Sequence, residues 1–168
     1  METRTPISVQ EYLSTAYSPD CDYVDGEVRE RNLGEFDHSR LQKKLILYFG
    51  NREKQWGIEV VPEQRVQVSA TRFRIPDVCV VLGEPDEQIF RKPPFLCIEI
   101  LSPEDRMSRM RERVADYLKM GVPYVWVLDP ESRSAFQITP AEGWREVKDG
   151  IMRTQNPALD VPLSEMFS

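Results

Sequence analysis

Three features of the sequence predict a three-layer α/β domain with a central mixed sheet. Short runs rich in β-branched and aromatic residues are typical of buried strands. Two longer segments have apolar residues at helical spacing, one before the first of these strands and one before the last. The run at 124–128 follows the second helix, and such a crossover joins parallel strands. The predicted core order is therefore α-β-β-β-α-β.

The first half of the chain supplies an N-terminal helix, a hairpin and the first core helix. Ser8 and Glu11 form a capping box for a helix that ends near Tyr17. Asp25-Gly26 lies between short apolar segments and predicts a tight hairpin. Asp37 can cap a helix over 38–52, and Gly57 ends that region.

The second half supplies the strands and the second core helix. Strands are expected at 58–68, 72–82, 95–101 and 124–128. A helix is expected from Pro103 or Glu104 to Met120, with Gly121 as its stop. The segments 134–138, 144–147 and 151–154 predict a C-terminal β-meander, with Asp149-Gly150 as a turn.

Length and composition narrow the class of protein. A chain of 168 residues is the size of one domain, so we expect a single domain over 1–168. No apolar run reaches the roughly 20 residues that span a bilayer, and the first six residues lack a signal-peptide core. We therefore expect no membrane partner and a cytoplasmic location. The net charge of −6 argues against a protein that coats nucleic acid, but not against a nuclease with a local basic rim.

One carboxylate lies within an apolar strand. Glu99 interrupts the run from Phe95 to Leu101, and an ionised carboxylate buried there costs several kcal/mol unless it is paired. Asp77 stands at the start of another apolar run. Two such acids side by side repel each other, and a divalent cation between them would remove that repulsion.

These residues resemble a known nuclease family. Asp25-Gly26-Glu27, His38, Pro76-Asp77, the run from Glu99 to Pro103 and the stretch from Tyr117 to Pro130 follow the order found in the Uma-two family. That family consists of restriction-endonuclease-like proteins within the PD-(D/E)XK nuclease superfamily. The resemblance covers about 22–130 and implies a restriction-endonuclease-like fold.

The resemblance also implies chemistry. It implies that Asp77, Glu99 and Glu27 hold Mg²⁺, with Mn²⁺ as a substitute, and that the substrate is DNA. The lysine expected two residues after Glu99 is Leu101 here, and the resemblance moves the cation to the following helix, at Arg113. Arginine stays protonated, so it can stabilise charge but cannot serve as a base. His38 and Arg109 are expected as accessory residues.

Each of these residues also has a purely structural interpretation. Glu99 could form a structural ion pair, Asp77 could simply start a strand, and Glu27 could be a solvent-facing hairpin residue. His38 could merely sit in a first helical turn, and the arginines at 106, 109 and 113 could form a solvated face.

Two functions from different classes remain at this point. The first is a metal-dependent DNA endonuclease. The second is a degenerate member that binds nucleic acid or a protein partner without cutting, and an acidic structural domain is a third possibility. We also expect a homodimer, because duplex cleavage needs two active sites. In addition, four apolar residues of the C-terminal segment are expected to be exposed: Phe136, Trp144, Met152 and Phe167.

Overall fold

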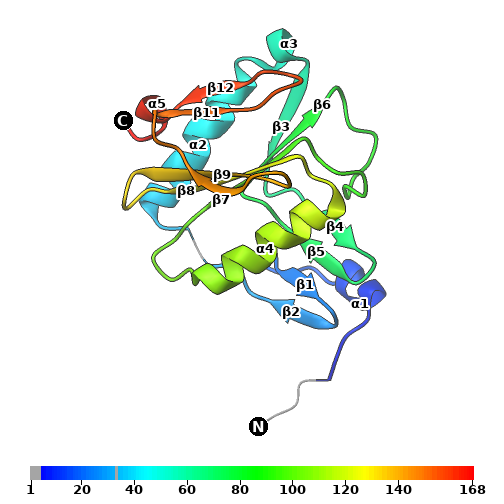
Figure 1. Cartoon of the computed structure of the whole chain (residues 1–168). Coiled ribbons are helices and arrows are strands. Elements are labelled where there is room, and N and C mark those ends of the chain that lie inside the picture. Colours follow the sequence, from blue (N-terminus) through cyan, green and yellow to red (C-terminus); the bar gives the residue numbers. More distant parts are fainter. Residues whose placement is uncertain (1–4, 33) are drawn as a thin grey trace.

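The structure, a computed structural model, describes residues 5–32 and 34–168 (Figure 1). The helices are α1 (Val9–Ser14), α2 (Phe36–Gly50), α3 (Glu53–Trp56), α4 (Met107–Met120) and α5 (Leu163–Met166). The strands are β1 (Asp22–Val24), β2 (Glu27–Arg29), β3 (Ile58–Pro62), β4 (Val66–Ser69), β5 (Arg72–Arg74), β6 (Val78–Leu82), β7 (Leu96–Ile100), β8 (Tyr124–Asp129), β9 (Ser134–Thr139), β10 (Gly143–Glu146), β11 (Ile151–Arg153) and β12 (Asp160–Pro162).

The central sheet is mixed, as predicted. Its six strands lie in the order β10-β9-β8-β7-β6-β3. β7 and β8 are parallel, because α4 carries the chain back between them, and the other neighbours are antiparallel. The predicted restriction-endonuclease-like three-layer fold is confirmed.

Two long helices cover opposite faces of this sheet (Figure 1). Leu41, Leu45 and Phe49 of α2 pack with Ile98 and other residues of one face. Met110, Val114 and Tyr117 of α4 pack on the other face with Cys97 and its neighbours. Successive residues of a strand point to opposite faces. Glu99, two residues after Cys97, therefore faces α4.

Two of the predicted strands are each broken in two. The segments expected at 58–68 and 72–82 form β3 and β4, and β5 and β6. Glu63 has a φ of 49°, which turns the chain after β3, and Pro76 has no N–H to continue the ladder after β5. β4 and β5 consequently join the N-terminal hairpin in a second sheet, ordered β2-β1-β5-β4, which the sequence did not reveal.

The prediction of a C-terminal β-meander is correct only in part. β9 and β10 extend the central sheet, but β11 pairs with β12 in a separate two-stranded sheet. Met152, expected to be exposed, is fully buried, and Phe136, Trp144 and Phe167 are half-buried. The apolar surface that motivated a homodimer is therefore smaller than expected.

Helix starts differ slightly from the prediction. α2 begins at Phe36 after Glu35, so Asp37 lies in its first turn and does not cap it. α4 begins at Met107, because Asp105 Oδ2 accepts hydrogen bonds from the N–H and hydroxyl of Ser102 and holds the preceding segment in a turn. Over the described residues, no helix combines the length and apolar character needed to cross a membrane. The expected cytoplasmic location was inferred from the first six residues of the sequence, and residues 1–4 lie outside the described residues.

Candidate functional site

The two acids identified in the sequence lie next to each other. Val78 of β6 pairs with Ile98 of β7 in an antiparallel register. One further step of this register sets Asp77 opposite Glu99, and residues opposed in this way have Cβ atoms about 5 Å apart. Asp77 Oδ2 also accepts a hydrogen bond of 2.8 Å from the N–H of Ile100, the residue after Glu99.

Asp77 is held by cations from two elements. An Nη2–H of Arg31 donates to Asp77 Oδ1 at 3.1 Å, and His38 Nε2 lies 3.4 Å from Asp77 Oδ2. Burial would raise the pKa of Asp77, but the hydrogen bond from His38 and the charges of His38 and Arg31 lower it. Burial opposes protonation of His38, but Asp77 outweighs it and raises the pKa of His38. Asp77 is therefore an ionised carboxylate in a paired environment.

Glu99 is bound from α4. The Tyr117 hydroxyl donates to Glu99 Oε1 at 2.6 Å, and Arg113 Nη1 donates to Glu99 Oε2 at 3.3 Å. Tyr117 and Arg113 are one helical turn apart, so both reach the strand below. From the sequence, Arg113 is expected to form an ion pair with Glu99 or Glu27, and in the structure its partner is Glu99.

Glu99 is electrostatically unlike Asp77. Its side chain is fully buried, and burial raises the pKa of Glu99 to about 8. The positive charge of Arg113 opposes this increase, and the negative charge of Asp77 adds to it. The pair therefore combines one ionised acid with one acid that gains its proton near neutral pH, the separation seen where two carboxylates share a site.

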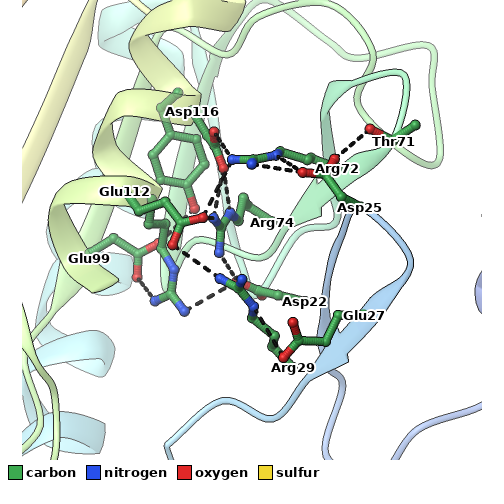
Figure 2. Close-up of polar contacts among 12 residues, drawn as sticks. Asp22, Asp25, Glu27, Arg29, Thr71, Arg72, Arg74, Glu99, Glu112 and Asp116 are labelled. Carbon is green, nitrogen blue, oxygen red and sulfur yellow. Dashed lines mark hydrogen bonds and ion pairs between the residues drawn. The ribbon is translucent and has the colours of Figure 1, made fainter. Parts of the chain in front are cut away.

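The structure does not bring Glu27 to this pair. Its side chain is 61% exposed and lies 3.6 Å from Arg29 within the hairpin. Asp22, on the neighbouring strand β1, is the buried acid that reaches the site. Asp22 Oδ2 lies 3.2 Å from Arg113 Nη2, the same guanidinium that binds Glu99 (Figure 2). The signal in the sequence is an acid next to Tyr23 and Val24, the same type of misplaced charge that identified Glu99.

A network of buried charges extends from Asp22 beneath α4 (Figure 2). Arg74 Nη1 donates to Asp22 Oδ2 at 3.2 Å, and Arg74 Nε donates to Asp116 Oδ2 at 2.8 Å. Arg72 Nη1 donates to Asp116 Oδ1 at 2.9 Å. The arginines of β5 therefore connect the second sheet to α4 and position the acid that orients Arg113. Sequence reasoning did not identify Arg31, Arg74 or Tyr117 as site residues, because a loop arginine, a strand arginine and a helix-face tyrosine carry no distinctive pattern.

The two expected accessory residues have different surroundings. Arg109 is exposed, and its side chain forms no ion pair or hydrogen bond within the described part of the chain. His38 lies between Asp77 and an open cleft of about 450 Å³. That cleft is also bordered by Leu101 and Met107, and its acidic lining residues are Glu35, Asp37, Asp105, Asp129 and Glu131.

The residues present fit a divalent cation that is completed by other oxygen ligands. No group of three or more His, Cys, Asp or Glu side chains within the described ranges has the geometry of a metal site. Mg²⁺ needs only one or two carboxylates, with water and phosphate supplying the rest. Asp22 Oδ1 is buried without a hydrogen-bond partner among the described residues, as expected for a free lone pair beside such a centre.

The fold and its paired acids define a restriction-endonuclease-like protein. A family model described as "Uma2: Putative restriction endonuclease" matches residues 9–164, and the chain belongs to this family. No curated protein sequence matches the chain.

Among solved structures, similarity is high in fold and low in sequence. One is a "putative nuclease belonging to DUF820" from Anabaena variabilis ATCC 29413, with a TM-score of 0.83 and 22% identity. That match covers 96% of this chain and 98% of the other. The DrdV–DNA complex has a TM-score of 0.41 and 15% identity, over 76% of this chain and 12% of the other. The first supports the fold, and the second is too distant to add to it.

Proposed function

We propose that this protein is a metal-dependent endonuclease that hydrolyses phosphodiester bonds of DNA. The observation that carries the proposal is the buried pair Asp77 and Glu99, set opposite each other on β6 and β7 beside an open cleft. Each acid has its own arginine partner, but ion pairing alone gives no reason for two acids to lie opposite each other beside a cleft, one with a pKa raised to about 8. Membership of the family supports the same function.

Asp77 and Glu99 would hold Mg²⁺ or Mn²⁺, with water and phosphate as further ligands. Asp22, and not Glu27, is the third buried acid nearby, and it acts by positioning Arg113. The cation would polarise the phosphate and lower the pKa of a bound water. Glu99 must lose its proton to act as a ligand, and its pKa of about 8 makes this loss incomplete at neutral pH. Arg31 and His38 already neutralise the charge of Asp77. When a cation binds, they would have to release the Asp77 carboxylate or share it with the cation.

Arg113 takes the place of the lysine found in the superfamily. It bridges Glu99 and Asp22, so its guanidinium is fixed beside the acids and within reach of a phosphate bound there. It stabilises negative charge that develops on phosphate, but it cannot accept a proton from the attacking water. The proton must leave through another group. His38, at the cleft side of Asp77, could accept it only after losing its own proton, because Asp77 raises the pKa of His38.

The test is cleavage of supercoiled plasmid with Mg²⁺ and with Mn²⁺. Asp77→Asn, Glu99→Gln and Asp22→Asn should each abolish cleavage, because each removes an acid of the buried group. Glu27→Gln is the matched control, since it removes an acid of the same hairpin that points to solvent. Cleavage that survives in Asp77→Asn and Glu99→Gln would refute the proposal.

A second candidate function is binding of DNA without cleavage. The observation that favours it is the neutralised state of the site, in which arginine, histidine and tyrosine side chains occupy the oxygens of Asp77 and Glu99. Wild-type protein that binds plasmid but leaves it intact with both metals would support this function over the first.

A further inference from the structure

Three cationic side chains meet at one place outside the acidic site. Arg40 Nη2 donates to the main-chain oxygen of Ser168 at 3.0 Å, and Lys44 Nζ donates to the same oxygen and to Ser168 Oγ, the latter at 2.7 Å. Arg133 donates to the main-chain oxygen of Phe167. The last two residues of the sequence therefore lie on a cluster of positive charge, here called the basic cluster (Arg40, Lys44, Arg133).

The fold holds these charges together although they repel one another. Arg40 and Lys44 are one turn apart on α2, and Arg133 lies in the turn between β8 and β9, where it adopts a φ of 55°. Loss of hydration and the charges of Arg40, Lys43 and Arg133 lower the pKa of Lys44. The oxygens that bind these cations in the structure come from Phe167 and Ser168, and a phosphate would offer oxygen acceptors together with negative charge to all three.

The basic cluster adjoins the acidic cleft. Arg40 and Arg133 line a hollow of about 180 Å³ that shares Asp37 and Pro130 with the larger cleft. His38, which pairs with Asp77, lines the larger cleft. Lys44 is six residues beyond His38 on α2, a distance of about 9 Å along the helix axis. Lys44 points to a different side of α2 than His38, but the two hollows share lining residues, so a nucleic-acid strand that follows them could have one phosphate at the buried acids and another over the cluster.

We propose that Arg40, Lys44 and Arg133 bind a backbone phosphate of the nucleic acid, and that Phe167 and Ser168 occupy this site in its absence. The proposal rests on the proposed function, since it assigns a second contact to the same substrate. It also answers an electrostatic problem. The chain carries a net charge of −6 and the cleft is lined by five carboxylates, so a polyanion needs a separate basic contact to approach.

The test is the salt dependence of DNA binding. A short fluorescein-labelled duplex is titrated with protein in Ca²⁺, and anisotropy gives the affinity at several salt concentrations. The slope of log K against log[salt] is about −0.9 for each phosphate contacted. Lys44→Gln and Arg133→Gln should each weaken binding several-fold and reduce the slope by about one. Lys54→Gln, an exposed lysine on α3, is the matched control and should change neither quantity.

A chain that ends at Met166 tests the covering segment. It should bind the duplex several-fold more tightly than the full chain, because nothing competes for the basic cluster. Phe167 packs against the core, so thermal melting first establishes that the shortened chain folds. If it does not fold, the two single substitutions decide the proposal.

Two results separate this proposal from the proposed function. Wild-type protein that binds the duplex with an affinity and slope unaffected by Lys44→Gln and Arg133→Gln would overturn the phosphate site and leave the nuclease assignment intact. If wild-type protein does not bind the duplex, NMR titration of the full chain with pyrophosphate decides. Saturable shifts of the Arg40, Lys44 and Arg133 amides that vanish in Lys44→Gln would preserve the site, and their absence would refute it.

Discussion

Replacing Glu99 with glutamine should change how stability depends on pH. The pKa of Glu99 is about 8 in the folded protein and near 4.5 in the unfolded chain. The folded state therefore binds more protons between these values, and the wild-type protein loses stability as pH rises through this window. Each pH unit is worth about 1.4 kcal/mol, so between about pH 5.5 and pH 8 the loss is about 3 kcal/mol. Glutamine does not titrate, so the variant should gain that amount relative to wild type.

Urea unfolding at the two pH values measures this difference. The lost ion pair with Arg113 is already contained in this pH-dependent difference, because the charge of Arg113 is one of the causes that set the pKa of Glu99. Any change in packing adds the same offset at both pH values. Glu112→Gln is the matched control on α4. The pKa of Glu112 is lowered, since the hydrogen bond from Arg29 and its charge outweigh burial, so it is ionised at both pH values. A Glu99→Gln difference that is as flat as the Glu112→Gln difference would refute the buried, proton-binding state of Glu99.

Three further predictions concern single measurements. Asp77→Asn should destabilise the fold by about 2–3 kcal/mol in urea unfolding, because it leaves the half-buried Arg31 without its ionised partner; an unchanged midpoint would contradict this. Wild-type cleavage of plasmid should be slow with Mg²⁺ and faster with Mn²⁺, and Arg113→Lys should increase it, whereas robust cleavage insensitive to loss of the Arg113 charge would show that Arg113 has no role. Light scattering at micromolar concentration should give the mass of a homodimer, and a monomeric mass would end that expectation.

The sequence predicted the parts of the fold that depend on local pattern. The two long helices and the strands β6, β7 and β8 were recognisable because each is a continuous apolar run or stripe with clear ends. The second sheet was not predictable, because β4 and β5 look like continuations of β3 and β6 until Glu63 and Pro76 turn the chain. Such turns depend on tertiary packing more than on residue preference.

The residues of the candidate site were likewise predictable only in part. Asp77 and Glu99 were found because each is an acid at an apolar strand, and Arg113 because the family resemblance implies a cation at that position of the helix; the structure brings the three together. Glu27 was named because the family resemblance implies an acid in this hairpin, and Asp22 was not considered. The register pairs Val24 with Glu27, so Glu27 lies on the same face of the hairpin as Asp22, but it lies next to the turn, where its side chain is exposed, whereas Asp22 is buried. The choice between the two acids needed the pairing of β1 with β5, which no local pattern gives.

The arginines explain how this chain tolerates so many buried acids. Asp22, Asp77, Glu99 and Asp116 each touch at least one guanidinium. Removing either partner of such a buried pair costs several kcal/mol, so the metal-free fold depends on the arginines. A cation that binds Asp77 and Glu99 must therefore compete with Arg31 and Arg113, and a phosphate that arrives with it gives both guanidiniums a new partner. Metal and substrate should consequently bind together more tightly than either binds alone, because each satisfies the charges that the other displaces.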